Sequence, residues 1–347
     1  MQPLSSTDGH RSGPGSTESP ASPSVGHRSW HATAWRLGRV VFLAAVLAFV
    51  GHLLWRNWGE LREHEFSLRW QPIAVSYAVL AVYLVNRGLI WHWMTYRFGC
   101  AIPLRQTLAA WFYSLPGKYV PGKLFLFAGR LHFYRRQGQS SLRVSMCFGL
   151  EAVSDILGGI LVLLIAPLFA DLPILAQYRI PALVLAALFL IAVRPAHLEL
   201  LANAVLKLAG RPPVSLPAQY RDMLGIVGMF TLNWALLGLG FFLFASALHP
   251  VQVQYLVYVA GAFALSCTIG ILALFAPGGL GVREGILVIS LSAIMPQAIA
   301  VAIALASRIW MTMGEMAAVG VVAILTRIRP GKTSQPTSSS EPYPGHH

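Results

Sequence analysis

Two charged, helix-breaking segments interrupt a chain that otherwise consists largely of long apolar runs. Residues 116–123 read Pro-Gly-Lys-Tyr-Val-Pro-Gly-Lys, and residues 277–285 read Pro-Gly-Gly-Leu-Gly-Val-Arg-Glu-Gly. Backbone N–H and C=O groups in hydrocarbon must be satisfied internally, so an unwound segment persists there only where protein buries it or where it lines a wet cavity. These two segments are therefore the first places to look for function.

The apolar runs themselves define the class of protein. The 347 residues are 56% hydrophobic and only 11% charged, and the mean hydropathy is +0.60. Several runs reach the roughly 20 residues that a spanning helix needs. The formal net charge of +13 would suggest a nucleic-acid partner in a soluble protein, but much of the Lys and Arg flanks apolar runs, as orientation signals do. We expect an all-α, polytopic membrane helix bundle with no nucleic-acid partner.

The spacing of these runs predicts a membrane-embedded domain over 37–326 between two polar tails. Residues 1–36 are rich in Ser, Gly, Pro and His and cannot bury enough apolar surface to offset the cost of ordering. Residues 327–347 are predicted to form a second disordered tail. The helices are expected at about 38–56, 73–93, 104–115, 124–134, 143–168, 174–193, 223–247, 251–275, 284–295 and 298–326.

Basic residues that flank the first and the last helix place both termini in the cytoplasm. Three of the expected helices are too short to cross a bilayer alone. One topology therefore has six crossings and two re-entrant hairpins, at 104–134 and 251–295, which would make the two halves inverted repeats. The alternative has eight crossings and one re-entrant element, because residues 251–275 are long enough to span outright.

Four of the thirteen carboxylates fall within predicted membrane segments. They are Glu151, Asp155, Glu284 and Glu315, and each needs a partner because a charge at the bilayer centre costs about 3 kcal/mol or more. Glu151 and Asp155 are four residues apart and share a helix face. Arg308 and Glu315, seven residues apart, share a face of the last helix. We hypothesise that these faces and the two breaker segments surround a polar cavity.

Basic side chains around the first breaker segment predict an anion site. Lys118 and Lys123 lie beside the N–H groups of an unwound loop that leads into a helix N-terminus, and Arg130 follows. Such a site suits the phosphate of a phosphodiester headgroup. The same cluster also fits a cytoplasmic orientation signal. Arg87 is interpreted instead as a long side chain that snorkels from a helix end to the headgroups.

No recognisable catalytic, nucleotide or metal motif is present in the sequence. Cys100, Cys147 and Cys267 lack the spacing of a metal site and are predicted to be reduced structural thiols. Residues 117–123 match G-x-x-x-x-G-K, but Leu124 stands where Ser or Thr would hold magnesium, and a membrane helix rather than a strand precedes the match. We therefore expect no cofactor, no metal and no enzymatic activity.

The order of the motifs resembles one family of membrane proteins. Tyr119-Val-Pro-Gly-Lys and Gly129-Arg130 are followed by the acidic pair at 151 and 155, by the Ala276–Gly285 block, and by Ser307-Arg-Ile-Trp310 with a glutamate downstream. This arrangement is similar to the lysylphosphatidylglycerol synthase transmembrane region, a flippase-like family of bacterial and archaeal inner-membrane proteins. The resemblance covers about residues 40–326, and its most specific part is the Pro-Gly-Gly-Leu-Gly-Val-Arg-Glu block.

The resemblance implies a translocase, without its own ATPase, for an anionic phospholipid or a lipid-linked phosphate headgroup in the bacterial inner membrane. Arg283 and Glu284 would pair with each other when no lipid is bound. Members that make lysyl-lipid carry a synthase domain after the membrane part, so this chain is not expected to make that lipid itself. Together with Lys118, the candidate substrate-binding residues are Pro121, Gly122, Lys123, Arg130, Glu151, Asp155, Gly278, Gly279, Gly281, Arg283, Glu284, Arg308 and Glu315.

Two alternatives remain open. The chain could be a non-transporting membrane partner that positions a separate glycosyl- or aminoacyl-transferase. It could also be a membrane-embedded transferase acting on a lipid phosphate, with Glu151 or Asp155 as general base.

Overall fold

A computed structural model of the chain describes residues 68–119, 124–169, 176–208, 219–273 and 279–328 and a few isolated positions. Contacts divide the chain into two units at Phe42 and Leu43, and every described residue belongs to the second unit. The predicted tail 1–36, almost all of the tail 327–347 and most of the first predicted helix lie outside the described residues.

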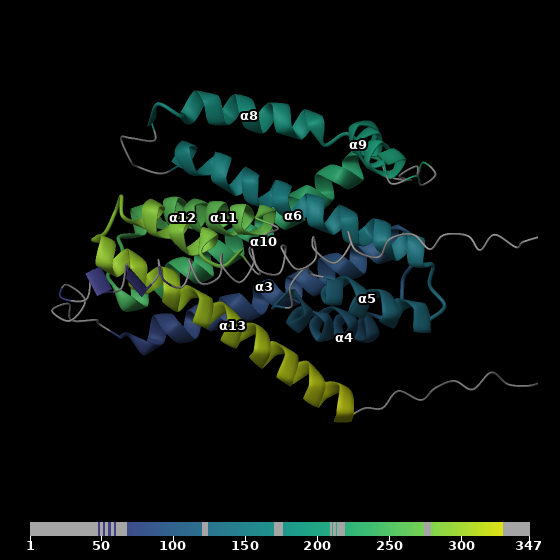
Figure 1. The fold of residues 1–347 in the computed structure, drawn as a ribbon, viewed down its shortest axis with the longest axis horizontal. Helices are drawn as coiled ribbons and strands as arrows, with labels where there is room; N and C mark the ends of the chain where they lie inside the picture. Colours follow the sequence, from purple (N-terminus) through teal and green to yellow (C-terminus); the bar gives the residue numbers. More distant parts are fainter. Residues whose placement is uncertain are drawn as a thin grey trace, which may run out of the picture. The chain divides into compact units, whose positions relative to one another are not determined.

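Within the described ranges every regular element is a helix (Figure 1). The predicted helix at 73–93 extends further at both ends. The other predicted boundaries that fall in the described residues agree within a few residues, except at 174–193. The elements are α3 (Trp70–Arg97), α4 (Leu104–Ser114), η1 (Leu115–Tyr119), α5 (Leu124–Arg136), α6 (Ser141–Phe169), α8 (Arg179–Ala192), α9 (Pro195–Leu208), α10 (Tyr220–Leu248), η2 (Val253–Tyr255), α11 (Leu256–Leu272), α12 (Val282–Leu291) and α13 (Gln297–Ile328).

Five helical segments of the described part are long and apolar enough to cross a membrane. They confirm the prediction of an all-α, polytopic bundle. By contrast α4, α5 and α12 have 11, 13 and 10 residues, which at about 1.5 Å per residue is well short of a hydrocarbon core of about 30 Å. The five segments are α3, α6, α10, η2 with α11, and α13.

The structure corrects the expected crossings in two places. The helix predicted at 174–193 is shorter in the structure: α8 begins only at Arg179, has 14 residues, and is not among the described segments that are long enough to cross a membrane. Residues 253–272 form a 20-residue apolar segment that is long enough to span a membrane. This length agrees with the eight-crossing alternative, in which residues 251–275 cross the membrane outright. The helix α9 was not predicted, because His197, Glu199 and Lys207 interrupt its apolar pattern.

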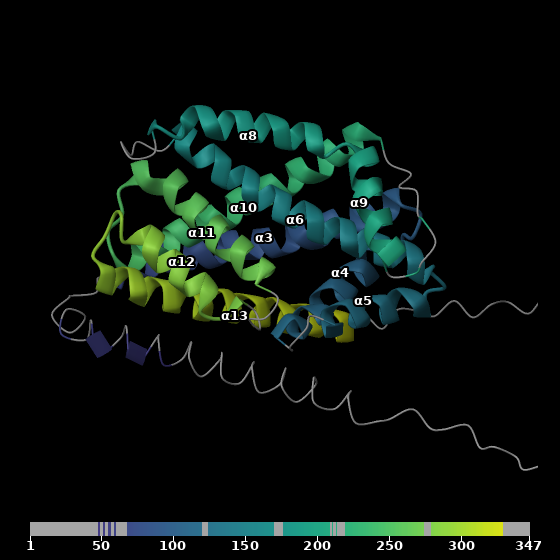
Figure 2. The same ribbon diagram turned by 45° about the horizontal axis from the view of Figure 1, so that its top comes forward.

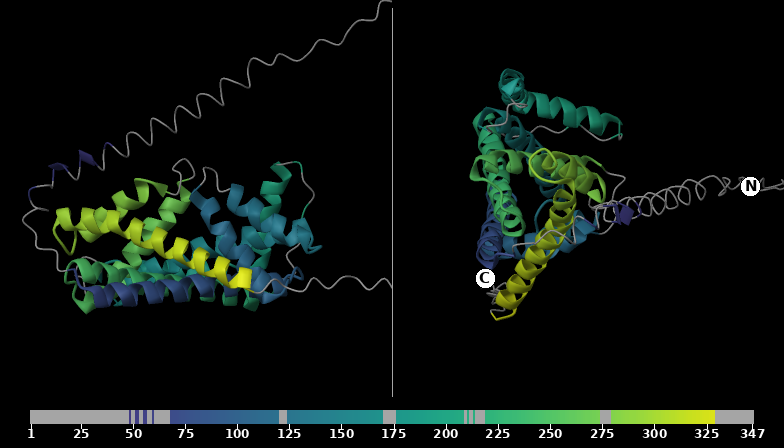
Figure 3. Two further views of the ribbon diagram at one scale, coloured as in Figure 1. Left: turned by 90° about the horizontal axis from the view of Figure 1, so that it is seen from below. Right: turned by 90° about the vertical axis from the view of Figure 1, so that its left-hand side faces the viewer.

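Helix α10 is the central packing element, since it contacts α3, α6, α11 and α13. Two small residues allow these close contacts. A Cβ at Gly158 of α6 would lie 2.8 Å from the carbonyl carbon of Phe230, and a Cβ at Gly238 of α10 would lie 2.4 Å from the Cβ of Ala260. Helix α8 packs mainly along α6 (Figure 2), and α13 runs beside α3 and α4 (Figure 3).

The two breaker segments produce two compact hairpins in this bundle. In the first, α5 folds back onto α4 and η1, and a Cβ at Gly117 would lie 2.5 Å from the amide nitrogen of Leu126. In the second, α12 packs against α11. Gly279 has a φ of +69°, which favours glycine, and a Cβ there would lie 2.8 Å from the Cα of Gly270. This contact lets α12 begin directly against the end of α11.

Candidate functional site: a charged cavity between the broken helices

A cavity of about 280 Å³ lies where the two hairpins meet the long helices. Its walls come from α3, α6, α10, α11 and α13 and from both hairpins. The lining is apolar over most of its surface but contains an unusual number of ionisable side chains for a membrane bundle. These are Arg87, Lys118, Arg130, Glu151, Asp155, Arg283, Arg308 and Glu315.

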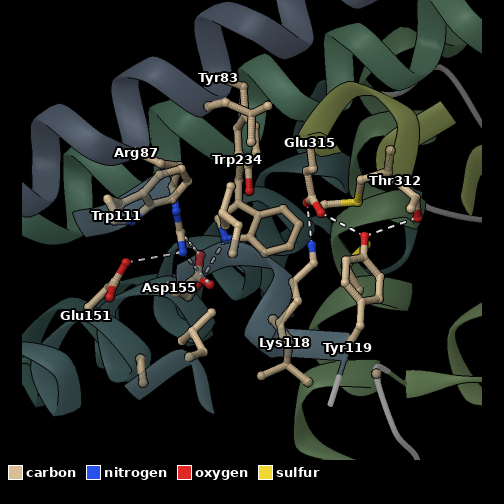
Figure 4. A pocket seen from close by; sticks show the side chains of 18 of the residues that line it. Tyr83, Arg87, Trp111, Lys118, Tyr119, Glu151, Asp155, Trp234, Thr312 and Glu315 are labelled. Carbon is tan, nitrogen blue, oxygen red and sulfur yellow. Dashed lines mark hydrogen bonds and ion pairs between the residues drawn. The ribbon is translucent and has the colours of Figure 1, made fainter. Parts of the chain in front are cut away.

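On one side of the cavity, two arginines and two carboxylates form a chain of ion pairs, of which Figure 4 shows Arg87 between Glu151 and Asp155. Arg130 of α5 donates to Glu151, and Arg87 of α3 donates to both carboxylate oxygens of Asp155, one of them at 3.2 Å. Arg87 also lies 3.6 Å from Glu151. Arg130 and Glu151 are buried, Arg87 and Asp155 are half-buried, and the guanidinium of Arg130 lies 4.7 Å from the ring of Trp91. Each charge here has a partner of opposite sign.

On the other side, the end of the first hairpin is tied to α13 through Glu315, whose residue exposure is 1%. Lys118 donates to one carboxylate oxygen of Glu315, and the hydroxyl of Tyr119 donates to the other at 2.8 Å. The Tyr119 hydroxyl also lies 3.1 Å from the hydroxyl of Thr312 (Figure 4). Burial and the nearby Glu315 carboxylate raise the pKa of Tyr119, so Tyr119 remains a neutral hydrogen-bond donor.

A third pair joins the second breaker segment to α13. Glu284 accepts from Arg308, and its other carboxylate oxygen accepts from the backbone N–H of Gly281 at 2.7 Å, which caps the first turn of α12. The expected pair between Arg283 and Glu284 is therefore wrong. The two side chains are consecutive on a helix and point in different directions, because neighbouring positions do not share a face.

Arg283 is the exception in this arrangement. It is 8% exposed, and the contacts of its guanidinium with described residues are the hydroxyl of Ser307 at 3.3 Å, the sulfur of Met311 at 3.7 Å and the ring of Phe263 at 5.0 Å. Its Nε has no hydrogen-bond partner. No carboxylate of the described residues lies within ion-pair distance of it, whereas each of the other cations that line the cavity has one.

The charge count of the site follows from these pairs. Five cationic side chains line the cavity, and four carboxylates pair with four of them, so the described part of the site carries one formal positive charge in excess. The excess is located at Arg283. A buried charge without a counter-ion is costly unless a ligand supplies the opposite charge.

The structure brings most of the described candidate residues to this one place. Seven line the cavity, and Glu284 pairs with one of the seven. Gly279 and Gly281 have positive φ at the start of α12 and set the position of Arg283. Pro121, Gly122, Lys123 and Gly278 lie outside the described residues. The seven are Lys118, Arg130, Glu151, Asp155, Arg283, Arg308 and Glu315.

Arg87 and the aromatic residues of the cavity were not among the site residues predicted from the sequence. The interpretation that Arg87 snorkels from a helix end is wrong, because α3 continues ten residues beyond it to Arg97 and its side chain is only 12% exposed. The length of the apolar run beyond Arg87 was the available signal. Tyr83 and Trp234 also line the cavity, but in sequence they look like any other aromatic residue on an apolar helix.

The resemblance noted from the motifs is confirmed by comparison with known families. The chain matches the family described as the lysylphosphatidylglycerol synthase TM region over residues 36–317. A search among curated proteins gave no match. The family description links the matched region to membrane-lipid modification, and the spanning helices fit a multi-pass membrane protein. The cavity is thus part of a chain that belongs to the lysylphosphatidylglycerol synthase transmembrane-region family.

Proposed function

We propose that this protein moves an anionic phospholipid or lipid-linked phosphate headgroup between the leaflets of a bacterial inner membrane, without hydrolysing ATP, and that both termini face the cytoplasm. The observation that carries the proposal is the buried guanidinium of Arg283, which has no carboxylate partner among the described residues, in a cavity whose other charges are balanced. A headgroup phosphate supplies the missing negative charge while its acyl chains stay in the surrounding hydrocarbon.

The location of the cavity supports transport rather than fixed binding. Its walls combine five segments that can cross the membrane with two broken-helix hairpins, and transporters often place their binding sites at such discontinuous helices. Four ion pairs join different helical elements around the site. The hairpin end at Lys118 and the start of α12 at Glu284 are both tied to α13 in this way.

The transferase alternative receives no specific support from the geometry. Arg130 pairs with Glu151, and Arg87 pairs with Asp155. Each carboxylate already accepts a hydrogen bond from an arginine, so neither is a free general base. The alternative in which the chain positions a separate transferase makes the same use of the cavity for lipid binding, and the flux experiment below separates it from transport.

The test is lipid flux in liposomes that contain the purified protein. An acyl-labelled phosphatidylglycerol is followed from the inner to the outer leaflet by its accessibility to a membrane-impermeant quencher. We expect flux above protein-free liposomes, a loss of about tenfold or more in Arg283→Gln, because a charge-assisted hydrogen bond is lost, and partial retention in Arg283→Lys.

The matched control for this test is Arg143→Gln. Arg143 is exposed and donates to the backbone carbonyl of Gly99, away from the cavity. Its replacement removes the same charge from the same protein and should leave flux unchanged. Wild-type protein without flux, or Arg283→Gln with wild-type flux, would contradict the proposal.

A further inference from the structure

One tyrosine hydroxyl in the cavity takes no part in the ion pairs described above. Tyr83 lies on α3 one turn before Arg87, lines the cavity and is 8% exposed. Figure 4 shows its side chain between the Arg87–Asp155 pair and the Lys118–Glu315 pair. Its hydroxyl makes no hydrogen bond to any described residue. Protein atoms do not completely enclose the hydroxyl oxygen. A hydroxyl on a buried side chain that remains open to the cavity can bond a ligand there.

The surroundings of Tyr83 determine what kind of group that partner is. The charged side chains on either side of it are already paired, Arg87 with Asp155 and Lys118 with Glu315. A charged ligand group placed here would find no counter-ion among them. An uncharged hydroxyl would, however, find a complement, because a tyrosine hydroxyl both donates and accepts a hydrogen bond.

We propose that Tyr83 selects headgroups that carry an uncharged hydroxyl beyond the phosphate, while Arg283 holds the phosphate itself. The inference rests on the proposed function for the role of Arg283. Tyr83 projects from α3 and Arg283 from α12, and both line the same cavity of about 280 Å³. A phosphodiester with a polyol headgroup satisfies both groups at once. A methyl phosphodiester satisfies only Arg283, and an ammonium headgroup places a charge beside paired ions.

The experiment measures binding to purified protein in detergent by native mass spectrometry, with two lipids that have the same acyl chains and the same single negative charge. Phosphatidylglycerol has headgroup hydroxyls, and phosphatidylmethanol has none. We expect wild-type protein to prefer phosphatidylglycerol by about fivefold, the worth of one neutral hydrogen bond. In Tyr83→Phe the preference should disappear, because binding of phosphatidylglycerol falls while that of phosphatidylmethanol stays the same.

The matched control is Tyr77→Phe, on the same helix. Its hydroxyl contacts only the sulfur of Met313, at 4.0 Å and outside the cavity, so the preference should remain. Equal binding of the two lipids by wild-type protein, or an unchanged preference in Tyr83→Phe, would overturn the assignment of Tyr83. Both results are independent of flux, so a chain that binds selectively but transports nothing would refute the proposed function and leave this inference standing.

Discussion

Replacement of Glu151 by Gln tests whether the ion pairs of the cavity are structural. Glu151 is the only carboxylate paired with Arg130 among the described residues, and Arg130 is 2% exposed. The substitution keeps the shape of the side chain but leaves a buried guanidinium with no counter-ion. Removal of one partner of a buried pair costs about 3–5 kcal/mol. Arg87 is affected less, because it keeps Asp155.

The three cysteines of the chain provide the assay, because Cys100, Cys147 and Cys267 are all free and buried. A thiol-reactive dye that fluoresces on coupling reports their exposure as detergent-solubilised protein is heated. At roughly 2 °C per kcal/mol for a large chain, Glu151→Gln should lower the midpoint by about 6 °C or more.

The double variant Glu151→Gln with Arg130→Met makes the test specific. Replacement of a whole buried pair by apolar groups is often close to neutral, so the double variant should recover most of the lost stability. A Glu151→Gln midpoint equal to that of wild type would refute the reasoning. A double variant that is no more stable than the single one would show that the loss came from packing rather than from a stranded charge.

Two further changes give expected outcomes in the same thermal assay. Gly238→Ala places a methyl group 2.4 Å from the Cβ of Ala260. Such overpacking should lower the stability by about 1–3 kcal/mol. A variant that is not destabilised would show that α10 and α11 can separate freely. Glu315→Gln should cost less than Glu151→Gln, because the side chain of Lys118 is 28% exposed and water can solvate it; an equal loss for both would contradict this ranking.

The sequence was sufficient to predict most of the helices, because apolar length and helix breakers determine where membrane helices begin and end. The predicted 104–115 and 143–168 agree closely with Leu104–Ser114 and Ser141–Phe169. The error at α8 arose because an apolar run of 20 residues was equated with one helix, although the helix in it begins only at Arg179.

The candidate site was predictable as a list of residues but not as a set of partners. Carboxylates within apolar helices are costly, so their presence alone pointed to a polar cavity. The identity of each partner depends on helices that are distant in sequence, as in the pairs of Asp155 with Arg87 and of Glu284 with Arg308. For this reason the sequence suggested a pair between Arg283 and Glu284, and the unpaired state of Arg283 emerged only from the packing of α12 against α11 and α13.

The most direct test of the central claim keeps Arg283 and changes only its charge balance. The sulfur of Met311 lies 3.7 Å from a guanidinium nitrogen of Arg283, so Met311→Glu brings a carboxylate within reach, and Met311→Gln is a neutral control of similar size. Flux of labelled phosphatidylglycerol is measured for both. We expect from this claim that Met311→Glu lowers flux by about tenfold or more, as Arg283→Gln does, while Met311→Gln transports. Transport by Met311→Glu at the rate of Met311→Gln would contradict it.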